Sequence, residues 1–328
     1  MGANMRIDSS GRTTRCLTML ATAMACLFLM AREDISVAGI QGSGFYATSY
    51  GYISEFGSIF VNGVEYDISA ANIVINGQPA TESQLRLGQV VTVKGRVNAE
   101  GTAGEATDVS VTSTVRGPLA NIDLENGTLM VLGQRIRLLP DTFLDPQLHL
   151  GGILGLLPGV KVTVSGFPNS AGEIVATRID LAIGGGASRF TGVMQSLNTN
   201  ARTFRVNDEV VSYADASLVG TLADGRTVSV AGTVPFGQGV LRATSVEVIS
   251  GVGGTVDEVG QVEGLITVFN SATEFSLGAQ KVVTDADTVF LLEGKTLGPD
   301  LGVVVRGTYD SAGILVARQV KVTSLGQP

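Results

Sequence analysis

Val91-Thr92-Val93-Lys94-Gly95 is the stretch that decides the fold, because three similar stretches follow it along the chain. They are Val162-Thr163-Val164-Ser165-Gly166, Val228-Ser229-Val230-Ala231-Gly232 and Val303-Val304-Val305-Arg306-Gly307. Ten or eleven residues after each final glycine, a second strand-like run begins, at Ala106, Ala176, Ala243 and Ala317. Alternating apolar residues predict β-strands, and recurrence at a nearly fixed period predicts an array of repeats. We therefore expect four copies of one β unit.

Length and composition agree with a small, turn-rich β unit. The four marker glycines Gly95, Gly166, Gly232 and Gly307 are 71, 66 and 75 residues apart in a chain of 328. The chain holds 43 glycines and no tryptophan, and 44% of its residues are hydrophobic, which is enough to form packed cores. The formal net charge is −8 and there is no basic stripe, so nucleic acid is not expected as a partner.

Domain boundaries follow from the repeats. The repeats are predicted at residues 39–113, 114–183, 188–250 and 255–324, and we call them repeats 1 to 4. Gly184-Gly185-Gly186 and the glycine-rich run 251–254 separate the later repeats and are interpreted as hinges.

Residues 1–38 resemble an export signal. Arg6, Arg12 and Arg15 precede an uncharged run from Cys16 to Ala31, and small residues at 36–38 suit a signal peptidase. An uncleaved membrane anchor and a lipoprotein acylated at Cys26 are the alternatives. The protein is therefore expected to be exported, periplasmic or extracellular, and to meet the membrane only if this segment is retained. Cleavage would remove both cysteines, so the mature barrels would be held by core packing alone.

Local turn signals give the details of repeat 1. Asn62-Gly63 and Asn76-Gly77 predict two-residue hairpin turns, since both residue types tolerate positive φ. Thr81 and Gln84 fit a capping box around one helical turn, and Leu85 and Leu87 would then close the end of the barrel.

Several of these segments together resemble a known family. They are residues 56–64, 77–80, 85–95 and the strands with the pattern Ala-Thr-x-Val/Ile-x-Val/Leu. The family is the bacterial domain of unknown function 5666, which occurs as tandem copies in exported proteins. The resemblance covers about residues 40–324 and implies an all-β chain of four small barrels of the oligonucleotide/oligosaccharide-binding (OB) type in the cell envelope. Alternating strands with short turns also favour such barrels. The resemblance supplies no catalytic residue.

Motifs for catalysis, metals and cofactors are weak. His149 is the sole histidine and lies in an apolar, glycine-rich segment, which is more typical of a loop residue than of a general base. The acidic pairs 208–209, 257–258 and 285–287 do not fit a calcium loop and are interpreted as turn residues. No Lys-Ser/Thr follows Gly184-Gly185-Gly186, as a phosphate loop requires. No metal or cofactor is expected.

The aromatic cluster near the start of repeat 1 is the best binding candidate. Tyr46, Tyr50 and Tyr52 fall within eight residues together with Phe45, and exposed tyrosines can stack on sugar rings or peptide side chains. Alternatively, these aromatics cover the core of the first barrel.

Three hypotheses for function follow. The first is an exported, non-enzymatic binding or spacer module whose partner is an envelope glycan or protein. The second is a protein that binds cell-wall glycan or another polysaccharide through Tyr46, Tyr50 and Tyr52. The third is a carboxylate-based hydrolase, which requires two acids converging in a cleft.

Overall fold

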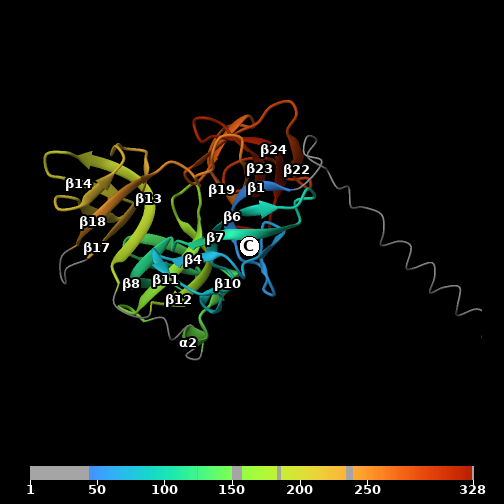
Figure 1. Ribbon diagram of the computed structural model, residues 1–328. Helices are drawn as coiled ribbons and strands as arrows, with labels where there is room; N and C mark the ends of the chain where they lie inside the picture. The colour runs from blue at the N-terminus through green and yellow to red at the C-terminus, as the bar shows by residue number, and fades with distance from the viewer. Residues whose placement is uncertain (1–43, 124, 150–156, 183–185, 234–238, 327–328) are drawn as a thin grey trace, which may run out of the picture. The chain divides into compact units, whose positions relative to one another are not determined.

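The computed structural model describes residues 44–123, 125–149, 157–182, 186–233 and 239–326, without the side chain of His149. The predicted signal at residues 1–38 and two of the three hinge glycines, Gly184 and Gly185, lie outside this part. Strands dominate the described residues, so the predicted all-β fold is confirmed (Figure 1). None of the helices in the described part is long and apolar enough to cross a membrane.

Repeat 1 contains five main strands and a short insertion. The main strands are β1 (Phe45–Tyr52), β2 (Ile59–Val61), β3 (Val64–Asp67), β6 (Val90–Val97) and β7 (Ala103–Val111). The insertion contains β4 (Asn72–Ile75), β5 (Gln78–Pro79) and the 3₁₀ helix η1 (Glu82–Gln84). Strand β3 pairs with β7 in parallel, whereas β1–β6 and β6–β7 are antiparallel. The third strand therefore lies beside the fifth, and the fourth beside the first.

The other three repeats have the same arrangement. Repeat 2 contains β8 (Val115–Asp123), β9 (Thr128–Val131), β10 (Gln134–Leu144), α2 (Pro146–His149), β11 (Lys161–Pro168) and β12 (Ile174–Leu181). Repeat 3 contains β13 (Ser188–Asn198), β14 (Thr203–Val206), β15 (Glu209–Ser212), β16 (Ser217–Val219), β17 (Thr227–Thr233) and β18 (Val240–Ile249). Repeat 4 contains β19 (Val259–Ser271), β20 (Glu274–Leu277), β21 (Gln280–Val283), β22 (Val289–Leu291), β23 (Gly302–Tyr309) and β24 (Leu315–Val322).

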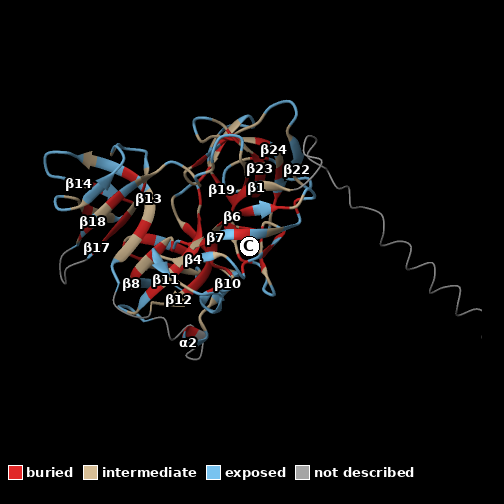
Figure 2. Cartoon of the chain, viewed as in Figure 1, coloured by how far each residue is buried: buried red, intermediate tan, exposed pale blue. Residues whose placement is uncertain are grey.

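Each of these three repeats closes on itself as a five-stranded barrel. In repeat 4, β19 pairs with both β20 and β23, and β24 pairs with both β23 and β21. The third and fifth strands are parallel in every repeat, through β3–β7, β10–β12, β15–β18 and β21–β24. Closure protects the strand edges, and buried residues recur along the strands of the barrels (Figure 2). The predicted tandem OB-like barrels are confirmed.

The marker glycines occupy the same position in all four barrels. The strand register shifts at each of them, between residues 94 and 95, 165 and 166, 231 and 232, and 306 and 307. A Cβ atom at Gly95 or Gly232 would lie 2.2 Å from a carbonyl oxygen of the neighbouring strand, and one at Gly307 only 2.0 Å away. The fourth and fifth strands therefore approach too closely at this bulge for any side chain.

The predicted turns of repeat 1 are also confirmed. Asn62 and Gly63 have φ of 55° and 78°, and Asn76 and Gly77 have φ of 52° and 80°. The Thr81 N–H donates to Gln84 Oε1 at 3.0 Å, which is one half of the expected capping box at η1. Leu85 is buried and Leu87 packs against the core of repeat 1, as expected for residues that close the barrel.

The first strand of each repeat also joins that repeat to another. Strand β8 pairs antiparallel with β13, which joins repeats 2 and 3 in one sheet and one continuous core. Strand β1 pairs in parallel with β19, with Ala47 opposite Val259 and Tyr50 opposite Val262 (Figure 1). The last repeat therefore pairs with the first, although some 200 residues separate the two strands in sequence.

A separate apolar cluster lies where repeats 1, 2 and 4 meet. Its buried members are Val90, Phe167, Val175, Leu265 and Leu325. Tyr50, Tyr52 and Leu139 pack against them. We call these eight residues the junction cluster. Because three repeats contribute to it, the cluster ties repeat 2 to the pair formed by repeats 1 and 4.

Candidate functional site

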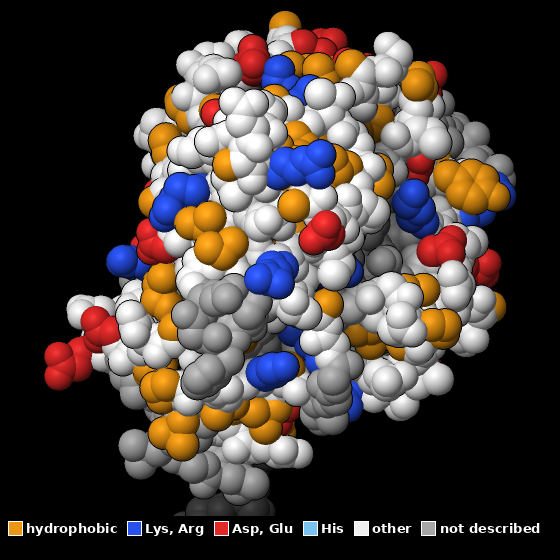
Figure 3. All heavy atoms as spheres, turned by 90° about the vertical axis from the view of Figure 1, so that its left-hand side faces the viewer, with side chains coloured by type: hydrophobic (Ala, Val, Ile, Leu, Met, Phe, Trp, Pro, Cys, Tyr) orange, Lys and Arg blue, Asp and Glu red, His pale blue; other side chains and the backbone are white. Residues whose placement is uncertain are grey.

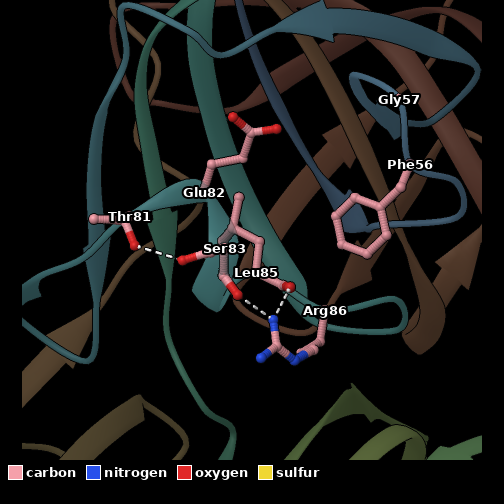
Figure 4. Close-up of a pocket in the computed structure, with 7 residues that line it drawn as sticks. All are labelled: Phe56, Gly57, Thr81, Glu82, Ser83, Leu85 and Arg86. Carbon is pink, nitrogen blue, oxygen red and sulfur yellow. Dashed lines mark hydrogen bonds between the residues drawn. The ribbon is translucent and has the colours of Figure 1, made fainter.

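An open hollow on repeat 1 is formed by the loop before β2 and by η1. It has a volume of about 610 Å³. Its lining residues are Phe56, Gly57, Thr81, Glu82, Ser83, Leu85 and Arg86 (Figure 4). We call it the η1 hollow. Because the hollow is open to solvent, it can hold part of an extended ligand but cannot enclose a small one.

One side of the η1 hollow is aromatic. Ser54 N–H donates to Phe60 O at 3.0 Å, and Phe60 N–H donates to Glu55 O at 3.3 Å, so the intervening residues form a tight loop. Phe56 lies at the tip of this loop with 47% of its surface exposed. Because the loop keeps the Phe56 ring exposed to solvent, the ring presents a flat apolar face to a ligand.

The opposite side is polar. Thr81 Oγ1 and Ser83 Oγ lie 3.0 Å apart and share a hydrogen bond, and the Arg86 guanidinium donates to the carbonyls of Ser83 and Leu85. Figure 4 shows the Phe56 ring on one side of the hollow and these groups on the other. Hydroxyl, carboxylate and guanidinium groups opposite an aromatic ring form a suitable surface for a hydroxyl-rich ring, whose faces are apolar and whose edges are polar.

A second, smaller pocket lies at the meeting point of repeats 1, 2 and 4. Its volume is about 170 Å³. Its lining residues are Tyr52, Ser54, Leu139, Asp141, Phe143, Ala176, Thr177, Ser324 and Leu325. We call it the junction pocket. The Thr177 hydroxyl donates to Gly88 O at 2.6 Å, which joins strand β12 to the loop that follows η1.

The three predicted ligand-binding tyrosines have different surroundings. Tyr46 is 66% exposed. Tyr50 packs edge-on against Phe167 of repeat 2, with ring centroids 5.9 Å apart and an interplanar angle of 89°, and burial raises its pKa to about 12. Tyr52 lines the junction pocket, and its pKa is raised by burial first and then by the charges of Glu263 and Asp141. The structure thus does not gather the three on one open face, and their ligand role stays a prediction.

Among the side chains that line the η1 hollow and the junction pocket, sequence reasoning proposed only Tyr52 as a binding residue. The capping box predicted the turn at residues 81–84, but no local pattern places Phe56 across from it. Asp141 and Phe143 of β10 face Tyr52 only because repeat 2 packs on repeat 1. A signal for Phe56 did exist, since it lies in one of the segments that carry the family resemblance.

Two of the three acidic pairs, 257–258 and 285–287, contain carboxylates that accept hydrogen bonds in turns. Asp285 Oδ1 accepts the Asp287 N–H at 3.0 Å, and its Oδ2 lies 3.2 Å from Arg318 Nη1. Glu258 accepts hydrogen bonds from the Thr255 N–H at 2.8 Å and from the Thr48 hydroxyl, and these bonds help to lower its pKa although burial acts in the opposite direction. Within the described ranges, no three His, Cys, Asp or Glu side chains are grouped as a metal site would require.

Other exposed apolar side chains are scattered. Val193, Leu218, Val256 and Val268 are each more than 40% exposed and come from strands or loops of repeats 3 and 4. On the face shown in Figure 3, hydrophobic side chains are interspersed with charged ones. Single exposed apolar residues are normal on soluble proteins and indicate no site by themselves.

Comparison with protein families agrees with this architecture. The sequence profile of the family described as domain of unknown function (DUF5666) matches residues 50–109, 116–180, 188–247 and 263–321. The chain belongs to the DUF5666 family. Each DUF5666 match runs from the first strand of a barrel to its fifth, so one copy of the domain corresponds to one barrel. All four matches fall inside the repeats predicted from the marker glycines. No curated protein matches the chain.

Proposed function

We propose that this DUF5666 protein is an exported, non-catalytic binding module of the cell envelope and that the η1 hollow is its ligand surface. One observation carries the proposal. The exposed Phe56 ring stands opposite the hydroxyls of Thr81 and Ser83 in a hollow of about 610 Å³. Strand pairing joins repeat 1 to repeat 4 and repeat 2 to repeat 3, which gives a stable scaffold on which such a surface can be presented.

A polysaccharide is the ligand class that this surface suits best. Sugar rings stack on aromatic side chains through their C–H faces and exchange hydrogen bonds with hydroxyl, carboxylate and guanidinium groups at their edges. The hollow is open rather than enclosed, which suits one or two units of a longer chain. Nucleic acid fits less well, because the chain carries a net charge of −8 and Glu82 lies in the hollow.

Hydrolysis is a weaker alternative. A glycosidase of the usual kind places two carboxyl groups on either side of the bond that it cleaves. Among the residues that line them, the η1 hollow has one carboxylate, Glu82, and the junction pocket has one, Asp141. This supports binding rather than turnover. The export part of the proposal is supported by the basic and apolar pattern of residues 1–38 and is tested by fractionating cells that produce the full chain.

The test is co-sedimentation of the purified protein with insoluble polysaccharides, including cell-wall sacculi, chitin and cellulose. Phe56→Ala should weaken binding by roughly fivefold, since one stacked ring contributes about 1 kcal/mol. Val268→Ala is the matched control, because Val268 is similarly exposed at 51% but lies in repeat 4. Equal binding by wild type and Phe56→Ala would contradict the site. Release of soluble sugar that Glu82→Gln abolishes would replace the binding function with hydrolysis.

A further inference from the structure

A buried carboxyl group lies at the junction of repeats 1 and 4. Glu263 follows Val262, the last residue of β19 that pairs with β1, and is only 6% exposed. Its Oε2 accepts the Tyr52 N–H at 3.4 Å, which is close to the limit of a hydrogen bond. A carboxylate with so little support is costly to bury, whereas a neutral carboxylic acid is far less so.

An unsatisfied acceptor lies beside this carboxyl group. Asn62, in the turn between β2 and β3, donates through Nδ2 to Tyr50 O at 3.0 Å and to Gln261 O at 3.2 Å. Its amide thereby contacts both β1 and β19. Asn62 Oδ1 is buried and has no partner. If the Asn62 amide were flipped, Oδ1 would face the carbonyl oxygens of Tyr50 and Gln261, which cannot donate to it. The two strands therefore fix the orientation of the Asn62 amide.

The two groups converge on Gly51. A Cβ atom at Gly51 would lie 2.3 Å from Asn62 Oδ1 and 2.9 Å from Glu263 Oε2. The absence of a side chain at this position is what lets both oxygens approach the same point. Asn62 Oδ1 needs a hydrogen-bond donor, because an unpaired buried acceptor loses its hydrogen bonds to water without replacement. A protonated Glu263, whose Oε2 lies close to the same point, could supply that donor.

We propose that Glu263 is a neutral carboxylic acid in the folded protein and donates its O–H to Asn62 Oδ1, which makes the junction of repeats 1 and 4 a proton-sensitive clasp. This proposal stands independently of the η1 hollow. The acid would satisfy the orphan oxygen of Asn62, and Asn62 already holds β1 and β19 together through its Nδ2 atom.

The groups around Glu263 agree with a neutral acid. Tyr50 and Tyr52 of β1 carry no charge near neutral pH, and on β23 the residue opposite Glu263 is Val304. Arg306 lies opposite Gln261 instead and donates to Gly101 O at 3.1 Å. With its amide correctly oriented, Gln261 also accepts from Arg306 Nε at 3.1 Å. Burial raises the pKa of Glu263 to about 7, although the Tyr52 N–H opposes the change.

The direction of the pH effect follows from this pKa. When the clasp opens, Glu263 regains water and its ordinary pKa near 4.5. The closed state therefore binds the proton more strongly than the open one, and its advantage is complete below about pH 4.5. Raising the pH to about 7 removes that advantage, and above pH 7 no further loss is expected.

The experiment is amide hydrogen exchange of the full chain from pH 5 to 8, corrected for intrinsic exchange rates. We expect protection of β1 and β19 to fall roughly tenfold for each pH unit up to about pH 7 and then to level off. Glu263→Gln keeps a donor for Asn62 but cannot ionise, so its protection should not change over this window. Glu258→Gln is the matched control at the same junction and should keep the wild-type pH dependence.

Infrared spectroscopy gives a second measurement on the wild-type protein itself. A protonated glutamate C=O band should be present at pH 5.5 and disappear with a midpoint near pH 7, and Glu263→Gln should lack it. The proposal is overturned if wild type shows no such band, if the band persists in Glu263→Gln, or if protection of β1 and β19 has the same pH slope in both proteins. The wild-type titration decides the matter even if a variant fails to fold.

Discussion

Replacing Phe167 with alanine should uncouple repeat 2 from repeats 1 and 4. Phe167 is 2% exposed and belongs to the junction cluster with Val90, Val175 and Leu265. Its ring meets Tyr50 edge-on at 5.9 Å. Truncating a buried phenylalanine costs about 3–5 kcal/mol, and the lost edge-to-face contact falls within that range. We expect the free energy of unfolding to fall by about 4 kcal/mol, measured by urea denaturation.

The strands that lose protection distinguish the loss of the junction cluster from a general loss of core packing. Phe204→Ala is the matched control, because Phe204 is equally buried but lies in the core shared by repeats 2 and 3. In amide exchange, Phe167→Ala should expose β1 and β19, whereas Phe204→Ala should leave them protected. A loss below about 1 kcal/mol for Phe167→Ala, or protection of β1 and β19 equal to that of wild type, would refute the reasoning.

Three further predictions concern stability. Gly307→Ala places a methyl group 2.0 Å from a backbone oxygen and should lower the free energy of unfolding by about 1–3 kcal/mol. The control Gly298→Ala has nothing within 4 Å of the added methyl group and should lower it by less than about 1 kcal/mol. Equal unfolding midpoints of the two variants in urea would count against the bulge argument. Gln134→Leu removes a buried amide that donates to Leu132 O at 3.0 Å and to a carbonyl of repeat 3 at 3.1 Å, so thermal unfolding should show a loss of about 1–3 kcal/mol. Burial raises the folded-state pKa of Glu263 to about 7, so protonation of Glu263 stabilises the folded protein at low pH. The free energy of unfolding should therefore fall by about 3 kcal/mol as the pH rises from 4.5 to 7.5, and this fall should be absent in Glu263→Gln.

The barrels could be predicted from the sequence because their signals are local. Alternating valines give the strands, the marker glycines give the bulge, and Asn62-Gly63 gives a hairpin turn whose φ angles the structure confirms. The same Asn62 side chain also reaches Gln261 O, 199 positions away along the chain. No pattern near Asn62 predicts that contact, because it depends on which repeat returns to β1.

The candidate site was harder to predict for the same reason. Tyr50 and Tyr52 belong to an aromatic-rich segment, and such a segment is equally suited to bind a ligand or to pack against a core. Phe167 is what makes Tyr50 a packing residue, and it comes from another repeat. The sequence assigns Phe56 no binding role, because its partners in the η1 hollow come from η1, some 25 residues further along.

The most direct test is whether repeat 4 pairs with repeat 1 in solution. Scalar couplings across backbone hydrogen bonds, measured by NMR on the deuterated protein, report such pairing strand by strand. The account predicts couplings between β1 and β19 in the parallel register that sets Ala47 opposite Val259 and Tyr50 opposite Val262. A β1 strand coupled to β6 alone, with no coupling to β19, would contradict it.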